Sequence, residues 1–317
     1  MDVQIVIAGL GIAGRDHARA LEQMTNATVV AVVDPDPSRT LTFRGQKVPV
    51  YPTVLATKSR HNPDVVVVAS PTPTHASVCS EVAEHFPAAE VLVEKPAAAD
   101  IADARRVIKD KPKTSVAFHM AFSAEVDWAL GIAQRKAHDL GRPVAIESVS
   151  SDPYQGCLVS AQQRLGNSWI DTGINALSVI DRFARLEYRN SLRQIGEESW
   201  SAFEGNFTCA VDGQKLDALV LTSWYATDRS RSTRIRYASG AELVMDHNAV
   251  SGYLKEHGSM TEIFGTDGSV GRRESHYRAL YKRWLDGKDA VFSPDDSMRL
   301  HELLLEPEPP ANSRQAD

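Results

Sequence analysis

The sequence predicts an α/β fold: a doubly wound parallel sheet in the first third, followed by an α+β domain with a large open, mainly antiparallel sheet. Three observations support this. Apolar runs alternate with helical stretches up to about residue 120, a glycine-rich turn follows the first run, and runs of alternating polarity appear after residue 140. A chain of 317 residues is long enough for two domains with separate cores.

Five runs rich in valine and isoleucine mark the strands of the first domain, which we place at residues 1–120. Apolar runs without polar alternation are typical of a parallel sheet that helices cover on both faces. They lie at residues 3–9, 27–34, 64–70, 89–95 and 114–119. Because helical stretches separate them, we expect crossover connections and a doubly wound sheet.

The segment GLGIAG follows the first strand and has the G-x-G-x-x-G spacing of a dinucleotide-binding turn. Gly9 allows a tight turn, Gly11 allows the backbone to approach a pyrophosphate, and Gly14 allows the helix to pack on the strand. We expect the cofactor also to contact Leu10 and Ile12. A glycine-rich turn can be only a turn, but the strand before it and the helix after it favour binding.

Asp34 ends the second strand, about 20 residues after the last glycine of the turn. A carboxylate at this position accepts hydrogen bonds from the adenosine ribose and repels a 2′-phosphate, so we expect NAD, with NADP possible. Arg39 could weaken that preference. The alternative is that Asp34 is a turn residue before Pro35.

Polar loops follow the third and fourth strands, at the sheet edge where ligands bind in such folds. The third strand leads into SPTPTH, and we expect Ser70, Pro71, Thr72 and His75 to contact the cofactor, although a structural turn uses the same residue types.

The fourth strand ends in Glu94-Lys95-Pro96, a charged pair after an otherwise apolar run. We expect Glu94 and Lys95 to lie at the cofactor and Lys95 to be the general acid/base, because an amine can exchange a proton with a hydroxyl whose carbon exchanges hydride. A surface lysine paired with Glu94 is the alternative.

The second domain is placed at residues 121–305. Alternating runs predict strands, and longer stretches predict helices. The strands lie at residues 144–152, 207–211, 216–225, 232–238, 241–247 and 260–265, and the helices at 124–138, 275–286 and 294–305. In STRIRYA, Thr233, Ile235 and Tyr237 face one side and Arg234 and Arg236 the other, so the sheet has one drier face. The tail at 306–317 is predicted to be disordered.

A further helix is predicted at residues 169–183, WIDTGINALSVIDRF. Asp171 and Asn175 are four residues apart and project from the same face. Asp171 could cap this helix, since an acidic residue in the first turn accepts backbone N–H groups, or it could face a ligand.

The chain resembles the glucose-fructose oxidoreductase / inositol dehydrogenase / rhizopine catabolism (Gfo/Idh/MocA) family. The resemblance lies in the glycine turn, in the Ser-Pro-Thr turn with His75, and above all in the Glu-Lys-Pro segment. The resemblance covers essentially the whole chain. It implies a Rossmann domain followed by an α+β domain that carries the substrate site and often an oligomer interface. We therefore expect a homodimer or homotetramer formed through the open sheet.

The same resemblance assigns roles in the second domain. The family supplies a D-x-G-x-H helix, and DTGIN occupies that place, so Asp171 matches and Asn175 replaces the histidine. An amide cannot act as an acid or base, which leaves Lys95 as the proton carrier, Asp171 to orient it and Asn175 to hold a substrate hydroxyl. DTGIN also resembles the branch that oxidises aldoses such as L-arabinose or D-galactose at C1.

Other substrate contacts are weighed against structural roles. His119, at the end of the last strand of the first domain, is as often structural as ligand-contacting. Trp169 is expected to contact the substrate; it could stack on a sugar with Trp224 and Tyr225, although aromatic residues on a sheet are more often core.

The sequence thus predicts an NAD(P)-dependent dehydrogenase or reductase that acts on CH–OH groups of a small polyhydroxylated substrate. Two alternatives are a reductase of a ketosugar or imine intermediate and a non-catalytic NAD(P)-binding sensor. Retention of Lys95 favours an enzyme, because a sensor has less need of it.

Composition excludes several other classes. A net charge of −6 without a basic run disfavours nucleic acid, and no run approaches the ~18 apolar residues of a membrane span. The first residues lack the order of a signal peptide, and three separated cysteines suggest a reducing cytoplasm. The scattered histidines predict no metal site: His17 is expected to pack or cap, and His247 and His257 lack convincing partners.

Overall fold

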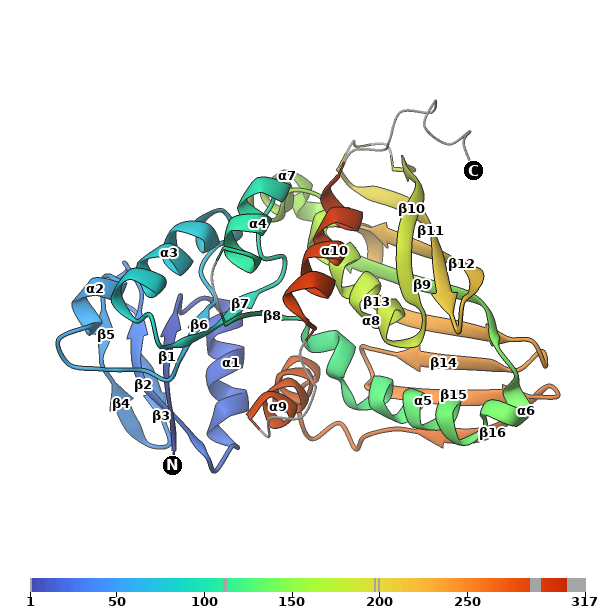
Figure 1. Cartoon of the computed structure of the whole chain (residues 1–317), viewed down its shortest axis with the longest axis horizontal. Coiled ribbons are helices and arrows are strands. Elements are labelled where there is room, and N and C mark those ends of the chain that lie inside the picture. The colour runs from blue at the N-terminus through green and yellow to red at the C-terminus, as the bar shows by residue number, and fades with distance from the viewer. Residues whose placement is uncertain (1, 111–112, 197, 199, 286–291, 307–317) are drawn as a thin grey trace. The chain divides into compact units, whose positions relative to one another are not determined.

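The computed structural model describes residues 2–110, 113–196, 198, 200–285 and 292–306, and the chain forms two compact units (Figure 1). The first unit comprises Met1–Ala124 and Asp267–Arg299, and the second comprises Glu125–Thr266 and Leu300–Asp317. The sequence placed a single boundary at residue 120, so the return of a C-terminal segment to the first unit is a feature it did not predict. Apart from residue 306, the predicted tail lies outside the described residues.

A six-stranded parallel sheet with the order β5-β2-β1-β6-β7-β8 forms the first unit, which confirms the predicted doubly wound sheet. Its strands are β1 (Val3–Ala8), β2 (Ala27–Val33), β5 (Val50–Tyr51), β6 (Val65–Val68), β7 (Glu90–Glu94) and β8 (Thr114–Ala117). The chain order reverses at β1 and β6, and ligands of open α/β sheets bind at the carboxyl ends of strands beside such a switch point.

Helices cover both faces of this sheet, α3 and α4 on one face and α1 and α9 on the other (Figure 1). This double cover explains why all four valines of β6 are buried. The remaining elements of the unit are α1 (Ile12–Glu22), α2 (Val54–Thr57), α3 (His75–His85), α4 (Ile101–Ile108), α9 (Arg272–Leu285), the 3₁₀ turns η1 (Thr72–Thr74) and η2 (His119–Phe122), and the hairpin β3 (Leu41–Phe43) with β4 (Gln46–Val48).

The second unit is built on an eight-stranded sheet with the order β10-β11-β12-β9-β13-β14-β15-β16. Only β12 and β9 pair in parallel among the described strands of this sheet. The strands are β9 (Pro143–Pro153), β10 (Arg185–Gln194), β11 (Ala202–Val211), β12 (Gln214–Ser223), β13 (Tyr225–Tyr237), β14 (Glu242–Asp246), β15 (Ser251–Glu256) and β16 (Ser259–Phe264). β10 and β15 were not predicted, and the other six overlap predicted runs.

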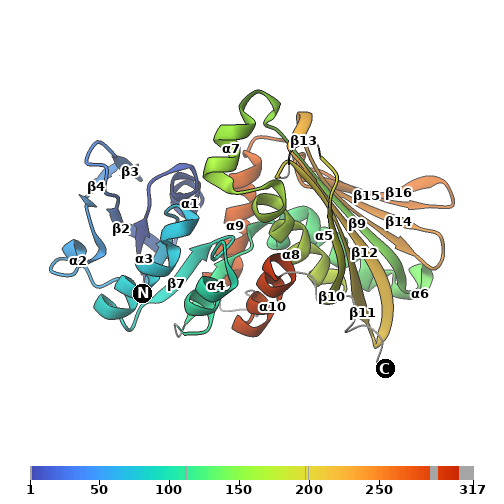
Figure 2. The ribbon, with the colours of Figure 1, turned by 90° about the horizontal axis from the view of Figure 1, so that it is seen from above.

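One face of the large sheet is covered by helices, and Figure 2 shows α5 and α8 on the same side of the strands. α8 packs against β9, β12 and β13. In β13, Thr233, Ile235 and Tyr237 are buried while Arg234 and Arg236 are exposed, as the alternation predicted. The helical segments are α5 (Ala124–Arg135), α6 (Ala137–Leu140), η3 (Gln155–Cys157), α7 (Leu158–Leu165), the π-helix η4 (Trp169–Gly173) and α8 (Ile174–Phe183). α10 (Pro294–Leu305) begins in the first unit, and its residues from Leu300 belong to the second.

Candidate functional site

The glycine turn connects β1 to α1 and has three different steric requirements. Gly9 has φ +101°, and a Cβ there would lie 2.5 Å from the backbone N of Ser70. A Cβ on Gly14 would lie 2.0 Å from the carbonyl O of Gly9. A Cβ on Gly11, in contrast, would meet no described atom within 4 Å. The open space at Gly11 adjoins the N-terminus of α1, whose N–H groups and positive dipole end suit a pyrophosphate, so the turn fits a dinucleotide.

The two hydrophobic residues of the turn differ in exposure. Leu10 is 0% exposed and packs inward, whereas the side chain of Ile12 is 65% exposed at the start of α1. Contact with the cofactor remains a prediction for both; a buried Leu10 can offer only its backbone.

Asp34 ties the end of β2 to the glycine turn. Its Oδ2 accepts a hydrogen bond from the backbone N of Leu10 at 2.8 Å, and its Oδ1 accepts one from the backbone N of Asp36 at 3.0 Å. An ionised carboxylate has about four acceptor positions, so Asp34 can hold the turn and still accept from ribose hydroxyls. Arg39 is ion-paired with Asp36, with Nε 3.1 Å from Oδ2.

The loop after β6 is braced from within by His75. This ring is 1% exposed, with Nδ1 3.1 Å from the Ala97 carbonyl O and Nε2 2.9 Å from the Ser70 carbonyl O. Burial lowers the pKa of His75, and its backbone hydrogen bonds oppose that shift. The enclosed ring of His75 braces this loop, whereas Pro71 and Thr72 are accessible. Contact of these three residues with the cofactor stays a prediction.

Glu94 is 6% exposed and turns into the first unit. Its Oε1 accepts a hydrogen bond from Tyr277 Oη at 2.6 Å and lies 2.9 Å from His17 Nε2, while His17 Nδ1 lies 2.7 Å from Tyr281 Oη. Burial raises the pKa of Glu94, but the hydrogen bond and charge of His17, the charge of Lys95 and the Tyr277 bond outweigh it, so the pKa falls below its ordinary value. Glu94 is therefore a buried anchor, and half-buried Lys95 is the charged residue that follows β7. The expectation that both residues lie at the cofactor stays a prediction.

His119 lies in η2, directly after β8, and is 6% exposed. Its ring centroid is 4.6 Å from that of Tyr277. Burial lowers the pKa of His119 well below 6.5, and the charges of His276, Lys95 and Arg272 act in the same direction. The imidazole is therefore neutral near pH 7, and its Nδ1 has no hydrogen-bond partner among the described residues. Substrate contact by His119 remains a prediction.

In the second unit, Asp171 and Asn175 lie at the start of the predicted helix, which differs in form from the prediction. The first five residues are wound as the π-helix η4, and the α-helix α8 begins afterwards. The Oδ1 of Asn167 accepts from the backbone N of Ile170 at 2.7 Å, so Asn167 provides a side-chain cap at this helix start, one of the two roles considered for Asp171. Asn175 is 5% exposed, and its Oδ1 has no partner among the described residues.

Trp169 is enclosed in the second unit, which favours the core alternative, and its contact with substrate stays a prediction. It is 2% exposed, stacks on Phe207 with ring centroids 6.0 Å apart, and donates its indole N–H to the Leu304 carbonyl O at 3.0 Å. Trp224 is 0% exposed, and Tyr225 is half-buried with its hydroxyl accepting from a backbone N–H. None of these three rings is a fully open stacking surface.

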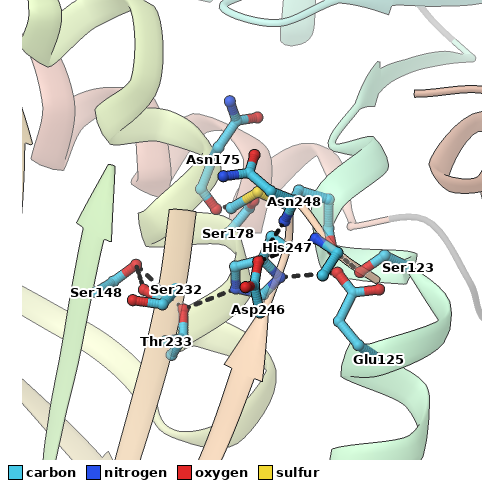
Figure 3. A network of polar contacts seen from close by, with 12 residues as sticks. Ser123, Glu125, Ser148, Asn175, Ser178, Ser232, Thr233, Asp246, His247 and Asn248 are labelled. Carbon is cyan, nitrogen blue, oxygen red and sulfur yellow. Dashed lines mark hydrogen bonds and ion pairs between the residues drawn. The ribbon is translucent and has the colours of Figure 1, made fainter. Parts of the chain in front are cut away.

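His247 has partners that the sequence did not reveal. Its Nδ1 lies 2.8 Å from Glu125 Oε1 and its Nε2 lies 3.0 Å from Thr233 Oγ1, which in turn lies 3.1 Å from Ser148 Oγ (Figure 3). All four residues are buried. Glu125 is 122 residues away in the chain, so no local motif could identify the pair. Because both ring nitrogens are engaged, we interpret this network as structural.

A second charged cluster in this unit was also missed by sequence reasoning. Asp152 is 1% exposed and is shared by two guanidinium groups, with Arg229 Nε 2.6 Å from Oδ1 and Arg231 Nη2 2.7 Å from Oδ2. Burial raises the pKa of Tyr154, the charges of Asp171 and Asp152 raise it further, and Arg229 and Arg231 act in the opposite direction. Asp171 therefore lies within electrostatic reach of this cluster.

The predicted site residues are divided between the two units. The glycine turn, Asp34 and Lys95 belong to the first, at the carboxyl ends of β1, β2 and β7. Asp171 and Asn175 belong to the second. A parallel sheet with a glycine turn and an acidic residue at these strand ends defines the first unit as a dinucleotide-binding domain of the Rossmann type.

Comparison with known proteins gives a family match for the first domain. Residues 3–122 match the Gfo/Idh/MocA family, described as an oxidoreductase family with an NAD-binding Rossmann fold. The match covers the first domain only, and it is to the family that the sequence resembles.

Relatives and solved structures extend the similarity. Inositol 2-dehydrogenase of Acidothermus cellulolyticus is 34% identical over 158 residues, 48% of this chain and 46% of the relative, so the match spans about half of its length. scyllo-Inositol 2-dehydrogenase (NAD(+)) of Bacillus subtilis is 24% identical over 95% of this chain and 82% of the relative. An oxidoreductase from Agrobacterium radiobacter, solved with NAD+, L-tartaric acid and magnesium, has the same fold, with a TM-score of 0.75 and 15% identity over 96% of this chain and 94% of that one.

Two further features concern the part of the chain that the structure describes. Its histidine, cysteine, aspartate and glutamate side chains form no group of three or more that could hold a metal ion. Its helices include none that is both long and apolar enough to cross a membrane.

Proposed function

We propose that this protein is an NAD-dependent dehydrogenase that transfers hydride between nicotinamide and a hydroxyl-bearing carbon of a sugar or another polyhydroxylated ring. The observation that carries the proposal is the common sheet edge, where the open turn at Gly11 follows β1 and Lys95 follows β7. The names of the inositol dehydrogenase relatives support a polyhydroxylated substrate.

Lys95 is the general acid/base of the proposed reaction. NAD, when bound, accepts the hydride of the substrate C–H bond. In this direction the neutral Lys95 amine takes the hydroxyl proton, and a carbonyl group remains on the substrate. Asp171 orients this pair and Asn175 holds a second hydroxyl, since its amide donates and accepts hydrogen bonds but cannot exchange the proton. Asp34 favours NAD over NADP through repulsion of a 2′-phosphate.

Oxidation of an aldose at C1 is the second candidate for the reaction. It is favoured by Asn175, because an anomeric hydroxyl is more acidic than an ordinary alcohol and a single lysine can suffice as its base. Oxidation of an inositol is favoured by the names of the relatives. The two reactions differ in product, a lactone in the first case and a ketone in the second.

We also propose a homodimer or homotetramer that forms through the sheet face opposite α8. Val149 and Ile263, which are 36% and 74% exposed, lie on this face among charged side chains such as Arg234. Sedimentation velocity of the full chain tests this assembly, and a monomer at micromolar concentration would contradict it.

A substrate panel tests the enzymatic proposal. We expect NAD+ to quench protein fluorescence on binding, and a panel of aldoses, inositols and polyhydroxylated acids to include compounds whose oxidation raises the absorbance of reduced nicotinamide. NADP+ in place of NAD+ tests the role of Asp34. Absence of NAD+ binding would refute the proposal, and reduction of ketosugars without oxidation of any hydroxyl compound would favour a biosynthetic reductase instead.

A further inference from the structure

Buried polar groups without partners gather on the helix-covered face of the second unit. Arg231 is 8% exposed and donates from Nη2 to Asp152, but its Nε and Nη1 have no partner among the described residues. The same holds for the indole N–H of Trp224, which is 0% exposed, and for Oγ of Ser150, which is 1% exposed. Folded proteins pair nearly all buried donors, so such a group of unpaired ones indicates a place for a ligand.

Sheet register places Ser150 and Arg231 of this group near the helical turn that carries Asp171. Thr222 of β12 pairs with Ser150 of β9, and Ser150 pairs with Arg231 of β13, so the three form one row across the sheet. Oγ of Ser168 lies 3.1 Å from Oγ1 of Thr222, which fixes the start of η4 over this row. Asp171 follows three residues later in the same π-helical turn.

The chemistry of the unpaired groups favours an anion. Asp152 is shared by Arg229 and Arg231, so one carboxylate serves two guanidinium groups. The guanidinium and the indole are donors only, whereas a neutral hydroxyl both donates and accepts. A carboxylate accepts only, and its two oxygens match the planar fork of an arginine.

We propose that Arg231, with Ser150 and Trp224 as neighbouring donors, binds a carboxylate of the substrate, and that the substrate is a polyhydroxylated acid such as a uronic or aldonic acid. This inference rests on the proposed dehydrogenase function and names the substrate class at that site. Asp171 and Asn175 then contact the hydroxyls of the same molecule.

Matched substrates test the proposal on the unmodified protein. D-glucuronate is compared with D-glucose, and D-galacturonate with D-galactose, by NAD+ reduction. Because a hydrogen bond to a charged group contributes more than one between neutral groups, kcat/KM is expected to be about 10- to 100-fold higher for each acid. The carboxylate assignment would be overturned if kcat/KM for the neutral sugars equalled or exceeded that for the acids. It would also be overturned if kcat/KM for D-glucose 6-phosphate exceeded that for D-glucuronate. Either result would leave the dehydrogenase proposal intact.

A variant pair separates recognition from folding. Arg231→Gln is expected to lower kcat/KM for the acids by about 10- to 100-fold and to change that for neutral sugars less than about threefold. Arg142→Gln, an exposed arginine just before β9 in the same unit, should change neither. An equal loss on acids and neutral sugars would assign Arg231 a merely structural role.

Binding measurements keep the test decisive if the variant does not fold or no compound turns over. The parent chain with NAD+ is titrated calorimetrically with D-glucuronate and with D-glucose. Tighter binding of the acid supports the inference, and equal affinities or no binding of the acid refute it. Failure to bind NAD+ in the same experiment would instead refute the proposed function.

Discussion

The two units build their polar sites in different ways. In the first unit, the turn glycines, Asp34 and Lys95 each follow directly after a buried strand. In the second, Asp152, Arg231 and Trp224 come from different parts of the large sheet, and Asp171 comes from a separate helical turn. The first arrangement depends on where strands end, and the second on the register between strands.

The buried charges show the same difference. Glu94 of the first unit is held by a histidine and a tyrosine, with no unpaired donor around its Oε1 among the described contacts. Asp152 of the second unit binds two arginines, and one of them keeps unpaired donors. A satisfied network stabilises the fold, whereas an incompletely satisfied one is suited to a ligand.

The largest expected effect comes from Lys95. Lys95→Ala should lower kcat about 10²- to 10⁴-fold, the usual contribution of a general acid/base. The Kd for NAD+ should change little, because cofactor binding depends mainly on the glycine turn. Initial rates and fluorescence titration measure the two effects. Lys58→Ala, an exposed lysine of the same unit, is the control; turnover of the Lys95 variant at the parent rate would remove Lys95 from the mechanism.

His247 tests whether the second unit also contains a purely structural network. His247→Leu removes the partner of buried Glu125 and should lower the free energy of unfolding by about 3–5 kcal/mol, as is typical when one member of a buried pair is lost. Urea denaturation measures this loss in the free energy of unfolding. Arg193→Ala breaks the solvent-exposed pair with Glu204 and should leave the midpoint unchanged. Similar midpoints for the two variants would contradict a structural role for His247.

Tyr277 tests the anchor of the first unit. Tyr277→Phe removes a hydrogen bond to the Glu94 carboxylate and should lower the free energy of unfolding by about 1.5–3 kcal/mol at pH 7. The pKa of Glu94 lies below its ordinary 4.5, so this stabilisation is present above pH 4.5 and is lost as the pH falls through the folded-state pKa.

Urea denaturation of this variant at pH 7 and at pH values below 4.5 measures that dependence. The difference from the parent should shrink at low pH. Tyr281→Phe removes a contact with His17 instead and should lower the free energy of unfolding by less, about 0.5–1.5 kcal/mol. A cost of Tyr277→Phe that is the same at every pH would show that the carboxylate charge is not involved.

Substitutions in the glycine turn are expected to change stability least. They distinguish a glycine that is needed for packing from one that is needed for cofactor binding. Gly14→Ala should destabilise the chain by about 1–3 kcal/mol, because the new Cβ meets the Gly9 carbonyl. Gly11→Ala meets no described atom and should leave the unfolding midpoint almost unchanged, yet weaken NAD+ binding. Denaturation and NAD+ titration of both variants provide the comparison, and unaltered NAD+ affinity in Gly11→Ala would argue against a pyrophosphate at that position.

Several elements were predictable because their signals are local. The valine-rich runs, the glycine spacing and the alternation in β13 each arise from residues that are close in the chain. β10 was missed because its sequence, RLEYRNSLRQ, has few apolar residues and forms a strand at the sheet edge by pairing with β11. The π-helical start of the predicted helix was also missed, since the hydrophobic period of a short segment does not distinguish the two windings.

By itself, then, the sequence determined the α/β fold, the dinucleotide turn and the position of Lys95 after a strand, because backbone geometry and side-chain periodicity act over a few residues. Only the tertiary structure decided that Trp169 is buried, that His247 pairs with Glu125, and that Arg231 retains unpaired donors. Those outcomes depend on cross-strand register and helix packing, which bring together residues that are distant in the chain.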